Sequence, residues 1–269
     1  MRVGIDIGGT TTKIVGVEDG EMVAWTSVRA SDPVASAAGA IGKFLSVSSK
    51  TMRDLDRLAV TGVGSTFIED CILGLEVTHV EEFKAIGLGG LKLAGVDKAL
   101  VVSVGTGTAI VHAEGSDARH VGGSGVGGGT ILGLGKALVG ITDFESLSLA
   151  ASEGDVKAVD LTIGDIASIA VGTLPLDATA SNFGRLADRP RPEDYAAGIV
   201  NMVFQTVGML SIFAARATND ATIVVVGNTM QIPMAKHVLD TLYPLYGVTF
   251  TVPELAQYAT ALGAALALH

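Results

Sequence analysis

Two stretches of the chain share one pattern of hydrophobic and polar positions. Residues 2–17 consist of an apolar run, a turn of small residues and a second run rich in β-branched side chains, and residues 99–111 repeat this order. Each stretch predicts a β-hairpin with a glycine-rich tip. Because one β-turn-β unit occurs twice, the sequence predicts two related lobes that face each other across a cleft.

Strand-like and helix-like patterns alternate over the rest of the chain. Helices are predicted at 33–45, from Glu81 onwards, at 144–153, at 195–215 and from Glu254 onwards, and strands at 56–61, 75–80 and 221–226. Strands that alternate with helices are typical of an α/β fold. Pro190 and Pro192 indicate a loop before the long helix rather than a domain boundary.

The long predicted helix has no charged residue between Tyr195 and Ala215. Its length would allow it to cross a membrane, but polar side chains such as Asn201, Gln205 and Ser211 interrupt it at nearly every turn. This pattern favours a buried central helix or a subunit interface.

Composition limits the classes of protein. The chain has 269 residues, of which 48% are hydrophobic and 17% charged. It is therefore long enough for an enzyme core and unlike a disordered chain or a coiled coil. Glycine occurs 35 times, which indicates many tight turns or close approaches of the backbone to a ligand.

Charge and cysteine content narrow the partners and the compartment. With 28 acidic and 18 basic residues the formal net charge is −10, which repels nucleic acid and anionic lipid, so an anionic ligand needs a local binding site. The single Cys71 cannot form an intramolecular disulfide, a cysteine-rich zinc site or an iron–sulfur cluster from this chain alone. Because no signal-peptide pattern follows Met1, we expect a cytoplasmic protein without nucleic-acid or membrane partners.

The first hairpin places a carboxylate beside a small-residue turn. Asp6 ends a strand expected to be buried, and the turn that follows can present backbone N–H groups and hydroxyls to an anion. We expect Asp6 to position Mg²⁺ through water. The residues expected around the phosphates are Gly8, Gly9, Thr10, Thr11 and Lys13. A plain hairpin with a glycine turn is the alternative.

Two later glycine segments could also approach a ligand. The tract 122–135 contains a G-x-G-x-x-G match, but the polar segment 116–120 precedes it where a dinucleotide fold requires a buried strand. A loop that runs into a helix, close to ATP phosphates or ribose, explains the glycines better. The buried strand that ends at Gly227 and Asn228 could border an adenosine pocket, although an ordinary strand-to-helix turn explains it equally well.

Together these motifs resemble known families. Asp6 to Thr10 and the second hairpin at Gly105 to Gly107 look like the ATPase core shared by actin, sugar kinases and heat-shock chaperones. A wider set resembles the type II pantothenate kinases in order and spacing: 60–64, 121–130, 133–135, 154–155, 159–160, 164–166 and 180–184. The resemblance implies an α/β fold of two actin-like, ribonuclease H-like lobes, at residues 1–97 and 98–269, with ATP in the cleft between them.

The resemblance also implies an activity. The family transfers the γ-phosphoryl group of ATP to pantothenate, the first step of coenzyme A biosynthesis, uses Mg²⁺ and forms homodimers. Besides the first hairpin, the residues expected to bind the nucleotide are Gly105, Thr106, Gly107, Gly127, Gly128, Gly129, Thr130, Phe144, Gly227 and Asn228. A kinase for another small hydroxyl compound, such as pantetheine or a sugar, and a slow nucleotide-binding regulatory ATPase remain alternatives.

Three residues are catalytic candidates by the same resemblance. The family's general base aligns with Glu82, with Glu81 as its competitor, and both could instead serve only a helix N-terminus. Relatives commonly carry arginine directly before Val-Gly-Gly, where this chain has His120, with Arg119 one residue earlier. We favour His120 over Arg119 as the residue facing the cleft, because neighbours on a strand point to opposite faces.

Three aspartates recur every five residues after the predicted helix at 144–153. They are Asp155, Asp160 and Asp165. We interpret all three as helix-start and surface carboxylates.

Overall fold

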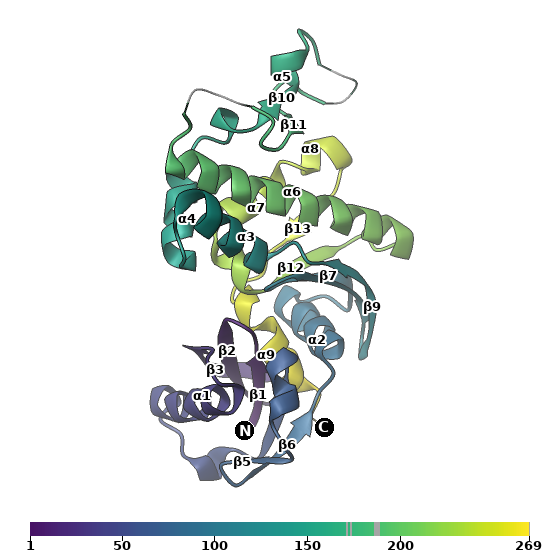
Figure 1. Cartoon of the computed structure of the whole chain (residues 1–269). Helices are drawn as coiled ribbons and strands as arrows, with labels where there is room; N and C mark the ends of the chain where they lie inside the picture. Colours follow the sequence, from purple (N-terminus) through teal and green to yellow (C-terminus); the bar gives the residue numbers. More distant parts are fainter. Residues whose placement is uncertain (171, 173, 186–188, 269) are drawn as a thin grey trace.

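The computed structural model describes residues 1–170, 172, 174–185 and 189–268, and these form two large β-sheets, each with helices packed on it, and one small two-stranded sheet (Figure 1). The strands are β1 (Arg2–Ile7), β2 (Thr11–Glu18), β3 (Glu21–Arg29), β4 (Arg57–Thr61), β5 (Cys71–Ile72), β6 (Leu75–His79), β7 (Lys98–Val104), β8 (Thr108–Glu114), β9 (Asp117–Ser124), β10 (Leu161–Thr162), β11 (Thr179–Ser181), β12 (Ile223–Val226) and β13 (Phe250–Thr251).

The helices alternate with these strands. They are α1 (Pro33–Ser48), α2 (Glu82–Ala94), α3 (Gly128–Leu134), α4 (Phe144–Glu153), α5 (Ile163–Ile166), α6 (Pro192–Thr218), α7 (Pro233–Asp240), α8 (Tyr243–Tyr246) and α9 (Ala259–Leu266). Short 3₁₀ turns occupy Met52–Asp54, Val63–Phe67, Val156–Ala158, Asn228–Gln231 and Ala256–Tyr258, and a π turn continues α3 over Gly135–Val139.

The two large sheets share a five-strand topology, and the first has β5 as an additional edge strand. The first has the strand order β3-β2-β1-β4-β6-β5 and the second has β9-β8-β7-β12-β13. In each sheet three strands form an antiparallel meander, and the first strand of the meander then pairs in parallel with a later one, β1 with β4 and β7 with β12. This duplication confirms the prediction of two related lobes.

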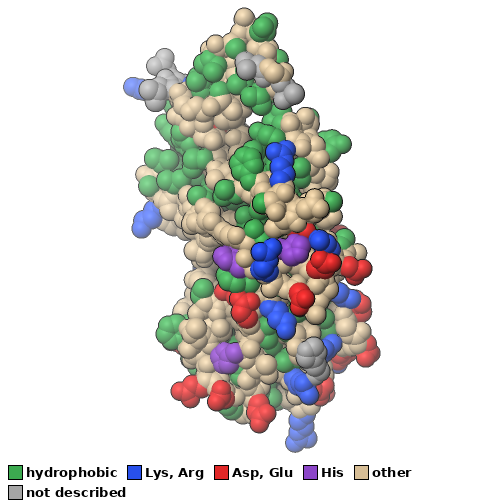
Figure 2. Space-filling view, turned by 90° about the vertical axis from the view of Figure 1, so that its right-hand side faces the viewer, with side chains coloured by type: hydrophobic (Ala, Val, Ile, Leu, Met, Phe, Trp, Pro, Cys, Tyr) green, Lys and Arg blue, Asp and Glu red, His purple; other side chains and the backbone are tan. Residues whose placement is uncertain are grey.

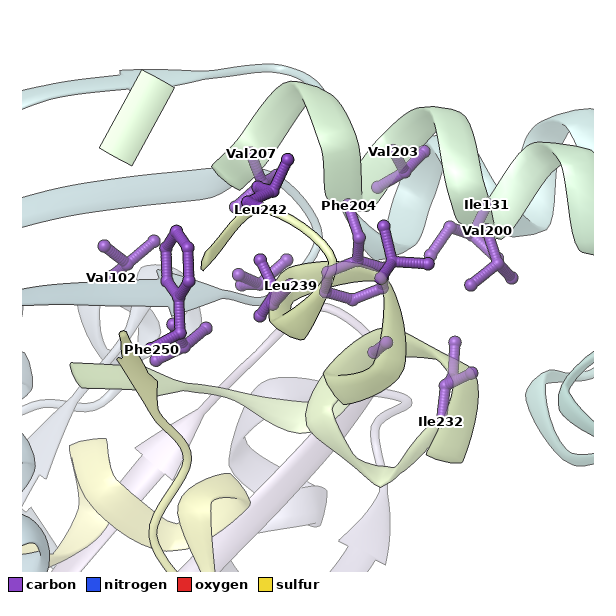
Figure 3. Close-up of a cluster of buried hydrophobic side chains, with 14 of the residues drawn as sticks. Val102, Ile131, Val200, Val203, Phe204, Val207, Ile232, Leu239, Leu242 and Phe250 are labelled. Carbon is purple, nitrogen blue, oxygen red and sulfur yellow. The ribbon is translucent and has the colours of Figure 1, made fainter. Parts of the chain in front are cut away.

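Helix α6 is the central helix of the second lobe. It is long and apolar enough to cross a membrane by length and composition, but 67% of its most apolar window is buried inside the structure. Figure 3 shows side chains of α6, among them Phe204 and Val207, packed with side chains from neighbouring elements, including Leu239 of α7. The expectation of a buried central helix is therefore confirmed.

Helices α2 and α9 cross each other between the two sheets. Helix α9 packs on β1, β2 and β4, and α2 packs on β7, β8 and β9 (Figure 1). The crossing is close because glycines meet backbone: a Cβ on Gly89 would overlap the carbonyl oxygen of Ala259, and one on Gly263 would overlap that of Ala85. Glu82, the catalytic candidate at the start of α2, is thus fixed to the sheet of the first lobe through α9. The predicted lobe boundary between residues 97 and 98 stays a prediction.

Several predicted boundaries were wrong. Strand β3 was not expected, although its residues alternate in burial along an edge strand. The polar segment before the glycine tract belongs to strand β9, which pairs antiparallel with β8 and so still differs from a dinucleotide-binding unit. The last helix begins at Ala259 rather than at Glu254, because Leu255 takes a left-handed conformation with φ of 58°.

The three regularly spaced aspartates have different surroundings. Asp155 caps the turn that starts at Val156, and Asp165 accepts the backbone N–H of Thr162, as expected of helix-start residues. Asp160 is instead fully buried, so its interpretation as a surface carboxylate was wrong. It accepts hydrogen bonds from the side-chain amides of Asn182 and Asn201 and from the backbone N–H of Phe183, and this ties the β10–β11 hairpin to α6.

Candidate active site

A cavity of about 450 Å³ lies between the two lobes. Most residues predicted to bind a nucleotide line it: Asp6, Gly8, Gly9, Thr10, Lys13, Gly105, Thr106, Gly107, Gly128, Gly129, Phe144, Gly227 and Asn228. Glu82 lines it as well. Residues that are up to 254 positions apart in the sequence (260 − 6), Asp6 and Thr260, therefore meet in one cleft.

Asp6 and Lys13 form an ion pair at the floor of this cleft on the first lobe. They are directly opposite in the β1–β2 ladder, and Lys13 Nζ lies 3.6 Å from Asp6 Oδ2. Only 13% of the Asp6 side chain and 9% of the Lys13 side chain are exposed. Burial raises the pKa of Asp6, and Lys13 opposes that shift. The pair thus gives the cleft a fixed carboxylate next to a fixed positive charge.

The tips of the two hairpins face each other across the cleft. In the first tip the backbone N–H of Gly8 donates to the carbonyl of Thr11, and in the second that of Gly105 donates to the carbonyl of Gly107. A Cβ built on Gly9 would lie 3.6 Å from Thr106 Oγ1 of the opposite lobe. An extended anion between the tips would therefore be held from both sides.

Three loops of the second lobe interlock around its hairpin tip. The N–H groups of Gly128 and Gly129 donate to the carbonyls of Gly105 and Thr106, at 2.8 Å each. Gly227 has φ of 109°, and a Cβ there would lie 2.5 Å from the carbonyl oxygen of Val104. Only glycine allows these loops to pack so closely.

Glu81 and Glu82 occupy different environments at the start of α2. Glu81 is exposed and caps the helix, accepting the backbone N–H of Lys84 at 2.8 Å. Glu82 lines the cleft, and its pKa is raised by burial first, then by the negative charges of Asp6 and Glu81. Glu82 is therefore the carboxylate available for acid–base chemistry.

Arg119 and His120 lie outside the lining of the cavity, and both are exposed. The ring of His120 stacks on the ring of Phe83, with the ring centroids 4.1 Å apart. Because Phe83 follows Glu82 at the start of α2, His120 lies on the α2 side of β9. Ala118 contacts α2 from the same face, because a Cβ on Gly87 would lie 2.8 Å from Ala118 Cβ. Arg119 therefore points to the opposite face of the strand.

Three residues predicted to bind the nucleotide, Thr11, Gly127 and Thr130, lie outside the lining of the cavity. The hydroxyl of Thr130 donates to the carbonyl of Gly125 and accepts the N–H of Gly127, which fixes the start of α3. The Thr11 hydroxyl is buried and has no hydrogen-bond partner among the described residues. These contacts give Gly127 and Thr130 a structural role in holding the glycine loop.

The cavity also includes residues that the sequence analysis missed. The polar ones are Ser103, Thr108, Ser124, Thr229, Gln257 and Thr260. Thr229 directly follows the predicted Gly227 and Asn228, and its hydroxyl donates to the carbonyl of Val104 at 2.7 Å. Gln257 and Thr260 reach the cleft only because the end of the chain returns to β1, which no local pattern indicates.

The donor set fits a nucleotide-bound magnesium ion. Among the described residues no cluster of three His, Cys, Asp or Glu side chains could hold a metal, and the carboxylates that line the cleft are those of Asp6 and Glu82. Mg²⁺ in kinases usually keeps several waters and is bound through one or two carboxylates and the substrate phosphates. Asp6 can supply such a carboxylate.

Comparisons with known proteins agree with this geometry. A sequence model of the Fumble family matches residues 98–248. The chain is 28% identical to a type II pantothenate kinase of Staphylococcus haemolyticus, covering 98% of both chains. It is 33% identical to a type II pantothenate kinase of Staphylococcus aureus, covering 85% of both.

Solved structures share the fold at low identity. An activator of 2-hydroxyisocaproyl-CoA dehydratase from Clostridium difficile with bound ADPNP superimposes with a TM-score of 0.71 at 18% identity, over 98% of this chain and 92% of that one. A ROK family glucokinase from Streptomyces griseus, in complex with glucose and AMPPNP, gives 0.59 at 15% identity, over 98% and 97%. The actin-like two-lobed α/β fold predicted from the sequence is therefore confirmed.

Proposed function

The chain belongs to the Fumble family of type II pantothenate kinases, and we propose that it transfers the γ-phosphoryl group of ATP to the primary hydroxyl of pantothenate. The products are 4′-phosphopantothenate and ADP, which makes this the first step of coenzyme A biosynthesis. The observation that carries the proposal is the placement of Glu82 beside Asp6 in a cleft whose remaining walls are glycine-rich loops.

In this proposal the two hairpin tips hold the phosphates of ATP. Gly8 and Gly9 approach them from the first lobe and Gly105 to Gly107 from the second, while Lys13 supplies positive charge. Phosphoryl transfer depends mainly on positioning and charge neutralisation, and this arrangement provides both. The binding of ATP analogues by two proteins of the same fold supports an adenine nucleotide here.

Glu82 acts as the general base. Its carboxylate accepts the proton of the pantothenate hydroxyl while the hydroxyl oxygen forms a bond to the γ-phosphorus. The bond from the γ-phosphorus to the bridging oxygen of ADP breaks, and ADP leaves with that electron pair. A raised pKa makes Glu82 a stronger base than an ordinary exposed glutamate, which suits this step.

Asp6 would hold magnesium through the metal's water shell. When bound with the nucleotide, the ion neutralises phosphate charge and so favours the transfer. The side chain of Asp6 is fixed for this role by Lys13 on one side and by the close approach of Gly62 on the other, where a Cβ would lie 2.5 Å from Asp6 Oδ1.

An acceptor screen tests the proposal. The purified chain with ATP and Mg²⁺ is offered pantothenate, pantetheine and glucose in parallel, and ADP release and the phosphorylated product are measured. We expect pantothenate to accelerate ADP release above the acceptor-free rate and to become phosphorylated. Efficient phosphorylation of pantetheine or glucose without pantothenate would make the chain a kinase for another hydroxyl compound. Slow turnover that no acceptor changes would indicate a regulatory ATPase.

We also propose that the enzyme is a homodimer that associates through the second lobe. Figure 2 shows hydrophobic side chains gathered over the upper part of the molecule and charged ones over the lower part. The exposed large hydrophobic residues of the second lobe include Phe213 on α6 and Ile166, Ile169 and Leu176 around the β10–β11 hairpin. Burial of such a surface favours association.

Light scattering tests this association. A mass near twice 27.3 kDa is expected for the wild type at micromolar concentration. Phe213→Asp should shift the mass toward the monomer, whereas Val47→Asp on α1 of the first lobe should not, although the two side chains are similarly exposed at 55% and 57%. A monomeric wild type would contradict the proposal.

The activity and the thiol chemistry also point to a compartment. Cys71 is exposed and unpaired, which suits a reducing environment, and the proposed reaction consumes ATP. We therefore propose a cytoplasmic enzyme, which fractionation of cells that express the tagged chain would test.

A further inference from the structure

Thr61 is a buried residue whose hydroxyl has no hydrogen-bond partner in the described part of the chain. It is the last residue of β4, the strand between β1 and β6, and it is paired directly with Asp6 in the parallel β1–β4 ladder. Buried hydroxyls are normally hydrogen-bonded, since an unpaired one destabilises the fold. Threonine at this place therefore requires an explanation other than stability.

Thr61 faces the same layer as the ion pair at the cleft floor. Side chains two residues apart on a strand share a face, and Ala59 packs in a cluster with Ala85 of α2 and Ala264 of α9. On the neighbouring strand β2, Val15 packs against α9 and so shares its face with Lys13. Thr61, Asp6 and Lys13 thus form one row across β4, β1 and β2.

The Asp6 carboxylate extends between its two neighbours in this row. Its Oδ2 is the atom 3.6 Å from Lys13 Nζ. Gly62 is the residue after Thr61, and a Cβ built on it would lie 2.5 Å from Asp6 Oδ1. Paired residues on adjacent strands have their Cα atoms about 5 Å apart, so a change of the Thr61 rotamer can bring its hydroxyl to this oxygen.

We propose that Thr61 is a positioning residue, whose hydroxyl donates a hydrogen bond to the Asp6 carboxylate in the nucleotide-loaded cleft. Lys13 and Thr61 then hold the two carboxylate oxygens from opposite sides, and Asp6 keeps one orientation toward hydrated magnesium. The proposal rests on the nucleotide site of the proposed function, but it does not depend on which acceptor is phosphorylated.

Thr12 provides a matched control on the other face of the same sheet. It is also fully buried, and its hydroxyl likewise lacks a partner among the described residues. Two residues on, Ile14 packs in the core under α1, so Thr12 faces that core and not the cleft. Thr12→Val and Thr61→Val make the same chemical change at equal burial, and only the second touches the row that contains Asp6.

The experiment measures ADP binding by calorimetry with and without Mg²⁺, together with urea unfolding of each variant. The wild type should bind ADP more tightly with Mg²⁺. Thr61→Val should lose at least about tenfold of that magnesium-dependent gain, which is the effect of one hydrogen bond to a charged group, while its affinity for ADP alone stays unchanged. Thr61→Ser should retain the gain, and Thr12→Val should behave as the wild type. Neither valine variant should unfold at lower urea.

Three outcomes would overturn the proposal. Thr61→Val that keeps the full magnesium-dependent gain would show that the hydroxyl has no such role, and Thr61→Ser that loses it would assign the effect to the methyl group. If Thr61→Val does not fold, Thr61→Ala replaces it with the same expectation. A wild-type protein that binds ADP equally well with and without Mg²⁺ would also overturn the proposal. A wild-type protein that binds ADP more tightly with Mg²⁺ but does not phosphorylate pantothenate would overturn the proposed function alone.

Discussion

The backbone of Gly62 lies directly against the carboxylate of Asp6. A Cβ on Gly62 would be 2.5 Å from Asp6 Oδ1 and 2.9 Å from the carbonyl oxygen of Ile7, closer than real Cβ atoms come. Gly62 also has φ of 84°, which side-chain-bearing residues rarely adopt. The turn after β4 and the Asp6 carboxylate near the end of β1 are therefore in close steric contact.

We expect Gly62→Ala to abolish most of the activity, because the added methyl group displaces the Asp6 carboxylate. Gly74→Ala is the matched control: its φ is 81°, but nothing lies within 4 Å of its Cβ position. Gly74→Ala should cost about 1 kcal/mol of unfolding free energy through backbone strain, measured by urea denaturation, and Gly62→Ala should cost more because its methyl group also overlaps the carbonyl of Ile7. Only Gly62→Ala should lower kcat, and equal rates in the two variants would contradict the close approach.

The two glutamates at the start of α2 should respond differently to removal of charge. Glu82→Gln should lower kcat by about two to four orders of magnitude, the range for a positioned general base, and leave ADP binding largely intact. Glu81→Gln should change kcat by less than about threefold, because Glu81 caps the helix through the N–H of Lys84. If the larger loss occurred in Glu81→Gln, the base would be Glu81.

The raised pKa of Glu82 predicts an acid limb in the rate profile. A general base works only when deprotonated, so kcat should fall as pH decreases through the raised pKa, at a pH above the ordinary glutamate value of 4.5. Glu81→Gln removes one negative neighbour and lowers the pKa of Glu82, so the limb should move to lower pH. An acid limb that moved to higher pH in Glu81→Gln, or did not move, would show that the limb does not come from Glu82.

His120 and Arg119 should differ in their effect on turnover. His120 lies outside the cavity lining but on the α2 face of β9, where it stacks on Phe83 next to Glu82, whereas Arg119 points to the opposite face. Imidazole stabilises phosphoryl charge only when protonated, and guanidinium does so at any working pH. We therefore expect His120→Ala to lower kcat, His120→Arg to retain the wild-type rate or exceed it, and Arg119→Ala to have little effect.

Steady-state rates of the wild type and the three variants check this expectation. A larger loss in Arg119→Ala than in His120→Ala would reverse the assignment. Equal rates in the wild type and all variants would show that neither residue contacts the reacting groups.

Local patterns predicted the hairpins and most of the cleft, because strand, glycine tip and strand are adjacent in sequence. Asp6 and Lys13 flank the first turn, and Gly105, Thr106 and Gly107 form the second. The glycine tract was correctly interpreted as a loop leading into a helix, at α3.

Features that depend on long-range packing were not predictable. Gln257 and Thr260 line the cleft because the chain returns to β1 after β13. The burial of Asp160 depends on amide groups of Asn182 and Asn201, which lie 22 and 41 residues away. The five-residue spacing of the three aspartates does not indicate these two partners of Asp160.

The crossing of α2 and α9 has a consequence for biosynthesis. One face of the β1–β2 hairpin is covered by α9: Val15 and Val17 pack with Ala261 and Leu262, and Gly4 fits against Ala261. During vectorial synthesis the first strands leave the ribosome early, whereas residues 259–266 emerge only after every strand of the second sheet. The first lobe therefore completes its core last, although it is translated first.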